Sequence, residues 1–270
     1  MKKIAFYGKG GIGKSTTAAN VSAALSEMGH KVCQIGCDPK NDSTRLLLGR
    51  ICRETVLETV RRSKDGIVTA EQIIHTGFNG IQCVEAGGPE PGVGCAGRGI
   101  IVALEKLREL QAISEDRLIL YDVLGDVVCG GFAVPIREGY ATEIYIVSSG
   151  ELMSLYAANN IAKSVQRFAA RGEVRLGGII GNSRNILREK ELLLDFAEQI
   201  NTQLIAFMPR DSIVNQAEVN KKTVIEWASD SNQAALYRKL SHEIVENTHL
   251  TVPQPLEFEA LEALVLKYGA

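Results

Sequence analysis

A glycine-rich loop near the start of the chain carries the strongest sign of chemistry. Residues 8–16 fit the pattern of a glycine, four further residues, and then Gly, Lys and Ser. Glycines let consecutive backbone N–H groups turn toward phosphate oxygens, and the helix that follows directs its positive end at them. Lys14 adds a mobile positive charge, and the Ser15 hydroxyl can bind Mg²⁺. The sequence therefore predicts a nucleoside triphosphate and Mg²⁺ site made by Gly8, Lys9, Gly10, Gly11, Ile12, Gly13, Lys14, Ser15 and Thr16.

The same glycines allow a second interpretation. Gly8, Gly10 and Gly13 also fit the Gly-x-Gly-x-x-Gly pattern of dinucleotide sites, and Asp38 lies where an acid that binds the ribose of NAD would be expected. A dinucleotide gives no role to a Lys-Ser pair at the start of the helix, whereas triphosphate chemistry uses both residues. We therefore favour a triphosphate. Nucleotide binding that is insensitive to Lys14→Ala and to Mg²⁺ would favour NAD, and a purely structural glycine turn is the weakest interpretation.

Two acidic residues could complete a hydrolytic site. Asp122 follows the apolar run 118–121, as the metal-associated acid of a P-loop enzyme does. Asp38 is a candidate for orienting the attacking water, although a carboxylate at the end of a strand is as often a turn residue. Gly125 could sense the γ-phosphate. The expected catalytic residues are Lys9, Lys14, Asp38 and Asp122.

Short apolar runs alternate with amphipathic stretches along the chain. This is the rhythm of parallel strands connected by helices. The expected strands are 4–7, 32–35, 80–84, 118–121, 144–147, 176–180 and 204–207, and the expected helices are 15–28, 99–110, 154–168, 189–200 and a terminal helix within 256–268. The pattern predicts an α/β fold with a doubly wound, mainly parallel sheet of about seven or eight strands and helices on both faces. Ligands of such sheets lie beyond the carboxyl ends of the strands.

Composition excludes several classes of function. The 270 residues are 45% hydrophobic and 23% charged, which suits one domain spanning residues 1–270. A formal net charge of −2 argues against nucleic acid and anionic lipid as partners. No apolar run reaches the ~20 residues that span a bilayer, and the start of the chain is too short for a signal peptide. We expect a cytoplasmic protein without a membrane partner.

Cysteines and histidines add little when they are taken alone. The six cysteines include no Cys-x-x-Cys pair, so a cluster would need widely separated ligands. In a cytosolic chain they are buried thiols, catalytic groups or metal ligands rather than disulfides. We interpret four as packing residues (Cys33, Cys37, Cys52 and Cys83) and the four histidines as surface residues (His30, His75, His242 and His249).

The second lysine of the loop, Lys9, and three longer segments carry a family resemblance. The Gly-Lys-Gly-Gly-x-Gly-Lys-Ser form resembles the dimeric ATPases that include the nitrogenase iron protein and the partition and division-site ATPases. Segments 36–44, 84–99 and 121–132 closely resemble the nitrogenase iron protein family, and partition ATPases lack the cysteine-bearing segments. The resemblance continues through 156–160, 182–185 and 209–211 to the tail, so it covers essentially the whole chain.

The resemblance implies a function. Cys95 and Cys129 of each of two subunits would hold one [4Fe–4S] cluster at the two-fold axis of a homodimer, and Lys9 would reach the partner's nucleotide. Segment 122–129 would link the nucleotide to the cluster, so that MgATP hydrolysis drives electron delivery to a separate, heteromeric, cluster-bearing catalytic protein. Arg98 would dock that protein or carry ADP-ribose. Further nucleotide contacts are expected from Lys40, Asp42, Gly125, Asn182, Pro209, Arg210 and Asp211, and a ferredoxin or flavodoxin is implied as the electron donor.

The final substrate depends on the partner, because the reductase never touches it. Members of the family serve the reduction of dinitrogen, protochlorophyllide, a nickel tetrapyrrole or the carbon–sulfur bond of thioethers. Arg98 and segment 89–92 favour the nitrogenase side over protochlorophyllide reduction. The short stretch 65–80, Gln34-Ile35 before Gly36, Ser148-Ser149 and Gly181 resemble nitrogenase-like reductases, and our preference goes to a thioether or nickel-tetrapyrrole system. A true nitrogenase iron protein is the alternative, and a cluster-free partition-type ATPase is an alternative of another class that anaerobic iron content would separate.

Overall fold

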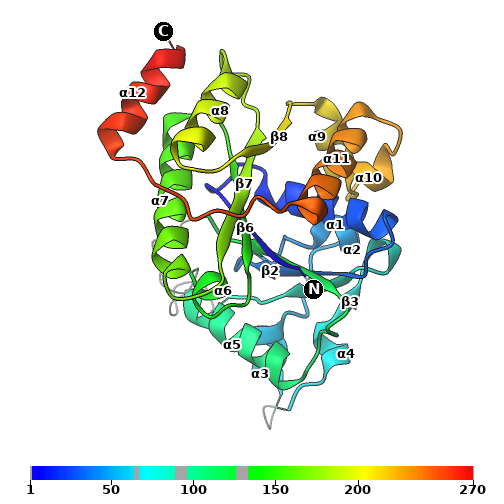
Figure 1. The fold of residues 1–270 in the computed structure, drawn as a ribbon. Helices are drawn as coiled ribbons and strands as arrows, with labels where there is room; N and C mark the ends of the chain where they lie inside the picture. The colour runs from blue at the N-terminus through cyan, green and yellow to red at the C-terminus, as the bar shows by residue number, and fades with distance from the viewer. Residues whose placement is uncertain (1, 64–66, 89–95, 126–132, 270) are drawn as a thin grey trace.

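An eight-stranded sheet forms the centre of the computed structural model, which describes residues 2–63, 67–88, 96–125 and 133–269. The strand order is β3-β4-β2-β5-β1-β6-β7-β8, and every pairing is parallel except that of β3 with β4 (Figure 1). The strands are β1 (Lys3–Tyr7), β2 (Val32–Cys37), β3 (His75–Thr76), β4 (Gln82–Glu85), β5 (Leu118–Val123), β6 (Glu143–Ser148), β7 (Arg175–Asn182) and β8 (Leu204–Met208).

Helices cover both faces of this sheet. They are α1 (Lys14–Glu27), α2 (Arg45–Leu48), α3 (Val56–Arg62), α4 (Ala70–Ile73), α5 (Ala96–Glu109), α6 (Val134–Arg137), α7 (Leu152–Ala169), α8 (Glu189–Gln199), α9 (Ser212–Val219), α10 (Val224–Trp227), α11 (Asn232–Glu246) and α12 (Phe258–Gly269). A 3₁₀ turn, η1 (Phe78–Gly80), precedes β4. Within the described residues no helix is both long and apolar enough to cross a membrane.

The alternation of side chains along β1 divides the core into two layers. Ile4 and Phe6 pack with α1 and α11 on one face, whereas Ala5 and Tyr7 pack with α5, α7 and α8 on the other. All four side chains are fully buried. Burial of each large apolar side chain stabilises the fold by about 1.5–3 kcal/mol. The predicted doubly wound α/β fold is confirmed.

The structure differs from the sequence expectations at the ends of elements, in the C-terminal third, and at the short elements α2, α3, α4, β3 and α6, which were not expected. The strand expected at 80–84 begins at Gln82, because Gly80 has φ 78° and closes the η1 turn. Helices α9, α10 and α11 were not expected. Side-chain caps define their starts, since Asp211, Thr223 and Ser231 each accept a hydrogen bond from the first turn.

The C-terminal tail returns across the sheet. Thr251 forms an antiparallel bridge with Leu176, and the chain then runs extended to α12, which packs on α7 and α8 (Figure 1). The expected terminal helix is therefore present. The parallel strands bring the loops after β1, β2, β5, β7 and β8 together at the carboxyl ends of the strands, where a ligand site is expected.

Candidate functional site

The glycine-rich loop joins β1 directly to α1 and has the conformation that its sequence predicts. Gly8 has φ 149°, and a Cβ there would lie 2.2 Å from the backbone oxygen of Val147. Gly13 has φ 95°, and a Cβ there would lie 2.3 Å from the side-chain nitrogen of Asn182. A larger residue at Gly8 would push the loop away from β6, and one at Gly13 would push it away from β7. Gly13 stands at the N-cap of α1, so the unpaired N–H groups of this helix face the loop.

A cavity of about 420 Å³ opens beside this loop and brings distant segments together. The predicted residues that line it are Gly10, Gly11, Gly13, Lys14, Ser15, Thr16, Asp38, Lys40, Asp42, Asn182, Pro209, Arg210 and Asp211. Gly8, Lys9, Ile12, Asp122 and Gly125 do not line it. The sequence did not identify the further lining residues Leu124, Ser183, Arg184, Val214, Asn215, Glu218, Gln233 and Tyr237.

Lys14, which lines this cavity, forms a buried ion pair with Asp122. The ammonium nitrogen of Lys14 lies 3.6 Å from a carboxylate oxygen of Asp122, and their side chains are 8% and 1% exposed. Asp122 was expected just beyond its strand, but β5 continues to Val123 and pairs Asp122 with Gly36 on one side and Phe6 on the other. Within the described parts of the chain, neither carboxylate oxygen of Asp122 accepts a hydrogen bond. Buried carboxylate oxygens without donors suit a hard cation such as Mg²⁺.

The loop after β2 places Asp38 at the cavity and holds it in a turn. The backbone N–H of Lys40 donates to a carboxylate oxygen of Asp38 at 2.9 Å, and that of Asn41 donates to the Asp38 carbonyl at 3.1 Å. Both readings of Asp38 thus have structural support, because it closes a turn and also lines the cavity. Burial, followed by the nearby Asp38 carboxylate, raises the pKa of Asp42. A cation bound beside these acids would relieve their mutual repulsion.

Glu85 holds the end of the loop after β2 through hydrogen bonds to Thr44. Its carboxylate accepts hydrogen bonds from the backbone N–H and the hydroxyl of Thr44, each at 2.7 Å, and the side chain is fully buried. A Cβ on Gly36 would lie 1.9 Å from the other carboxylate oxygen, so this glycine leaves the room that Glu85 needs. Sequence reasoning gave Glu85 no role. An acid at the end of a buried strand, with glycines following, was the available signal.

Protonation of Glu85 makes a testable contribution to stability. Burial, with smaller effects of Asp122 and Asp42, raises the pKa of Glu85 to about 8. Between the usual pKa of a glutamate and this value the folded chain binds more protons than the unfolded chain, so the free energy of unfolding falls as pH rises. We expect Glu85→Gln, which stays neutral, to lose less stability between about pH 5 and pH 8.5, with a difference on the order of a few kcal/mol.

Urea unfolding of the nucleotide-free protein at several pH values measures this difference. Glu115→Gln, which removes an exposed carboxylate, is the matched control and should follow the wild-type curve. Parallel curves for Glu85→Gln and the wild type would show that Glu85 keeps an ordinary pKa in the folded chain.

The loops after β7 and β8 close the other side of the cavity. The Asn182 amide donates to the Ile12 carbonyl at 2.6 Å, and the Arg184 guanidinium donates to the Gly11 carbonyl. Both therefore contact the glycine-rich loop of residues 8–16, the expected phosphate loop. Asp211 caps α9 by accepting from the N–H of Ile213 at 2.9 Å. The Thr16 hydroxyl donates to Glu218 at 2.6 Å and so joins α1 to α9. Most of the predicted nucleotide residues thus lie around one cavity, and some of them are held by contacts with each other or with Arg184 and Glu218.

A second buried acid, Glu189, fixes the loop that contains Arg184. Its carboxylate accepts hydrogen bonds from the N–H groups of Gly150 and Arg184 and from the Ser183 hydroxyl, at 2.6–3.1 Å. The side chain is 3% exposed. Glu189 therefore ties the loop after β6 to the loop after β7, a role that its position in an amphipathic helix did not reveal.

Gly125 brings the loop after β5 against the phosphate loop. A Cβ on Gly125 would lie 1.6 Å from the Gly8 carbonyl oxygen and 3.0 Å from the Lys9 carbonyl carbon. Lys9 itself is half-buried. The backbone of the expected sensing turn therefore touches the backbone of the expected phosphate site, so displacement of one loop acts directly on the other.

The remaining predicted residues are distributed differently. Cys95 and Cys129 lie outside the described residues. Arg98 is exposed in the first turn of α5, as a docking residue would be, and its docking role stays a prediction. The four cysteines interpreted as packing residues, Cys33, Cys37, Cys52 and Cys83, are buried. Of the histidines, two are exposed (His242 and His249), and two are half-buried (His30 and His75).

Comparison with known proteins gives a consistent family match. The model of the 4Fe-4S iron sulfur cluster binding proteins, NifH/frxC family, matches residues 2–270. The nitrogenase iron protein of Methanospirillum hungatei JF-1 is 56% identical over 270 residues, which are 99% of this chain and 96% of that protein. Nitrogenase iron protein 2 of Rhodobacter capsulatus is 55% identical over 99% of this chain and 98% of its own length.

Solved structures with a similar fold are more distant in sequence. The septum site-determining protein MinD from Pyrococcus horikoshii OT3, complexed with Mg-ADP, has a TM-score of 0.72 at 21% identity, over 91% of this chain and 97% of its own. A ParA family ATPase from Chlorobium tepidum TLS has a TM-score of 0.68 at 20% identity, over 89% and 98%. At such identities the likeness shows the fold alone, and it confirms the P-loop α/β architecture.

Proposed function

The chain belongs to the NifH/frxC family of 4Fe-4S iron–sulfur cluster binding proteins, and from this membership we propose that it delivers electrons to a nitrogenase or nitrogenase-like catalytic protein. As a member it is an ATP-dependent electron-transfer reductase that uses MgATP and a [4Fe–4S] cluster bridging two subunits. The cluster-free partition-type alternative is not retained, because MinD and ParA proteins resemble this chain in fold only.

One observation carries the proposal that the cavity is the nucleotide site. The buried ammonium of Lys14 lies 3.6 Å from Asp122, and the phosphate loop, with Lys14 and Ser15 at its end, borders the cavity. We assign Lys14 to the phosphates and Ser15 and Asp122 to Mg²⁺, because their oxygen atoms are the ligands that Mg²⁺ prefers. Asp38 would orient the attacking water, and Lys9 would act on the partner subunit's nucleotide.

The loop after β5 is the proposed route from nucleotide to cluster. Asp122 and Gly125 lie at the phosphate loop, and Cys129 follows four residues later in the sequence. The family implies Cys95 and Cys129 as cluster ligands, and the bound cluster supplies one low-potential electron. A γ-phosphate that displaces this loop would thereby shift the position of the segment carrying a cluster ligand.

The identity of the catalytic partner is the finer question. Identities of 55–56% to nitrogenase iron proteins support a nitrogenase partner. Ser148-Ser149 and Gly181 support a nitrogenase-like one. In the fold these residues have structural roles. The Ser148 hydroxyl lies 3.0 Å from that of Ser154, within hydrogen-bond distance. A Cβ on Gly181 would lie 2.8 Å from Phe207, so the glycine leaves room for this ring. Since neither position lines the cavity, both partner classes remain equal candidates.

An anaerobic affinity capture from the native host tests the proposal. The tagged dimer is incubated with lysate, Mg²⁺, ATP and aluminium fluoride, which mimics the transition state of hydrolysis, and the captured subunits are identified by mass spectrometry. Lys14→Ala, which should not form the closed state, is the control bait. Molybdenum- or vanadium-nitrogenase subunits would identify a nitrogenase component, whereas another cluster-bearing heteromer would identify a nitrogenase-like system. Equal capture by both baits would contradict nucleotide-gated docking.

A further inference from the structure

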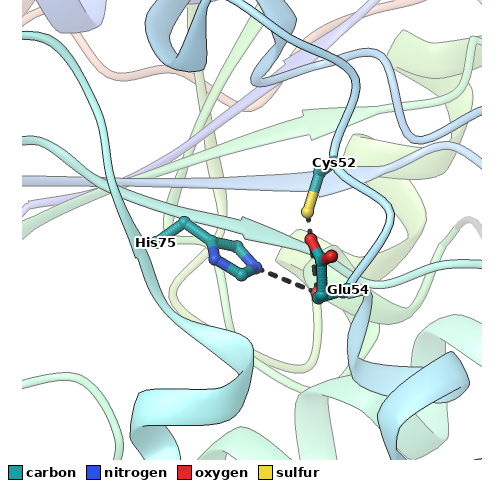
Figure 2. Close-up of side chains that lie close together, drawn as sticks. All are labelled: Cys52, Glu54 and His75. Carbon is teal, nitrogen blue, oxygen red and sulfur yellow. Dashed lines mark hydrogen bonds between the residues drawn. The ribbon is translucent and has the colours of Figure 1, made fainter.

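Three metal-binding side chains meet at the edge of the sheet that is formed by β3. Cys52 and Glu54 lie in the connection between α2 and α3, and His75 begins β3. The sulfur, one carboxylate oxygen and one imidazole nitrogen all lie within 4.8 Å of one another. Figure 2 shows the Cys52 sulfur and the His75 ring turned toward Glu54 from two directions. None of the three lines the nucleotide cavity.

Hydrogen bonds among these three residues show how closely Cys52 and His75 approach each other. The Nε2 atom of His75 lies 3.0 Å from the Glu54 carbonyl oxygen, and the Cys52 thiol donates to the same oxygen at 3.6 Å. Two side chains from separate segments of the chain thus point at one carbonyl oxygen. Around a tetrahedral Zn²⁺, with bonds of about 2.3 Å to sulfur and about 2.0 Å to nitrogen, ligand atoms stand about 3–4 Å apart. The sulfur, nitrogen and oxygen atoms of Cys52, His75 and Glu54 need only small shifts to reach that spacing.

These contacts also have an interpretation without a metal. The hydrogen bonds join the connection after α2 to the edge strand, and Arg50 lies 3.3 Å from a Glu54 carboxylate oxygen, which neutralises it. This accounts for His75 and for Glu54. It leaves the buried Cys52 thiol with one long, weak hydrogen bond beside an imidazole and a carboxylate. Sulfur, nitrogen and oxygen donors in one place are the ligand set that zinc takes.

We propose that Cys52, Glu54 and His75 bind one Zn²⁺ per subunit, separately from the nucleotide and the iron–sulfur cluster. Glu54 is exposed and borders a surface hollow of about 470 Å³, so an ion can reach the site from the side of this carboxylate. Mg²⁺ and Ca²⁺ do not suit the site, because they prefer oxygen ligands only. The ion would tie the connection after α2 to β3 at the sheet edge.

Binding has three identifiable costs. The His75 nitrogen and the Cys52 thiol must give up their hydrogen bonds to the Glu54 carbonyl oxygen. Burial, together with nearby carboxylates, raises the pKa of Cys52 to about 12, so Zn²⁺ must displace the proton of the thiol. Glu54 must also leave Arg50, but this ion pair is about half exposed and therefore weak. Zinc–thiolate bonding offsets such costs in structural zinc sites.

Zinc titration of the anaerobic, cluster-loaded dimer tests this proposal. A chromophoric chelator competes for Zn²⁺ in the absence of nucleotide, and iron content is followed so that damage to the cluster is detected. The test variants are Cys52→Ser, His75→Ala and Glu54→Gln. The matched controls are Cys33→Ala, which removes a buried thiol outside the proposed zinc site, and His249→Ala, which removes an exposed histidine. MgATP hydrolysis reports whether each variant is folded.

We expect one Zn²⁺ per subunit in the wild type and both controls, and at least about tenfold weaker binding in Cys52→Ser and His75→Ala. X-ray absorption at the zinc edge should show one sulfur neighbour. Glu54→Gln, an exposed replacement that leaves the core intact, should also bind more weakly. Wild-type binding no tighter than that of a Cys52→Ser/His75→Ala double variant would overturn the proposal, as would a zinc spectrum without sulfur.

Discussion

Gly125→Ala is expected to lower partner-dependent ATP hydrolysis and to destabilise the chain. The added Cβ would stand 1.6 Å from the Gly8 carbonyl oxygen and 2.6 Å from its carbon, so the two loops must separate. The phosphate loop cannot retreat, because Gly8 also lies against the Val147 carbonyl on its other side. Overpacking of this kind costs about 1–3 kcal/mol of folding free energy, and a displacement near 1 Å at the site lowers turnover by about 100-fold.

Partner-dependent ATP hydrolysis and thermal unfolding measure the two effects. Gly172→Ala is the matched control, because a Cβ there would meet only the Phe168 carbonyl oxygen at 3.9 Å, an ordinary contact. The control should keep wild-type hydrolysis. If Gly125→Ala also kept wild-type hydrolysis and thermal stability, the close contact between the two loops would not exist in the working protein.

Lys14→Ala is expected to abolish nucleotide-driven electron delivery, with hydrolysis falling by about 100- to 1,000-fold. The same change leaves the Asp122 carboxylate buried without its cationic partner at 3.6 Å. Removal of one member of a buried ion pair costs about 3–5 kcal/mol of stability. The variant should therefore lose both stability and activity, for two separable reasons.

A second substitution separates the two losses. Lys14→Ala combined with Asp122→Asn removes the unpaired charge, so stability should return toward the wild-type value while hydrolysis stays absent. Lys239→Ala, which removes an exposed lysine from α11, controls for net charge and should change neither property. Substantial hydrolysis by Lys14→Ala would refute the assignment of this lysine to the phosphates.

The parts of the site that the sequence predicted well are those encoded by neighbouring residues. The phosphate loop follows from the spacing of its glycines, Lys14 and Ser15, because backbone conformations at Gly8 and Gly13 are local requirements. The strands follow from apolar runs, since side chains buried on both faces of a parallel sheet leave a continuous signal. The family resemblance then supplied the cluster, the dimer and the partner, which no local pattern specified.

Residues that act through distant contacts escaped prediction. Glu85 holds Thr44 across 41 positions, and Glu189 joins the loops after β6 and β7. Each sequence environment looked ordinary, a strand end in one case and an amphipathic helix in the other. One of the four histidines interpreted as surface residues, His75, proves to lie beside Cys52 and Glu54 for the same reason.

The sequence by itself determined the chemistry of this protein: a triphosphate loop, acids at the ends of parallel strands, and two cysteines set among glycines in the manner of the iron-protein family. Tertiary structure decided which acid meets Lys14, how closely Gly125 approaches Gly8, and which buried carboxylates fix the loops. The physical reason is the range of each determinant. Backbone turns and apolar periodicity act over a few residues, whereas ion pairs and close packing arise only when strand order brings remote segments to one edge of the sheet.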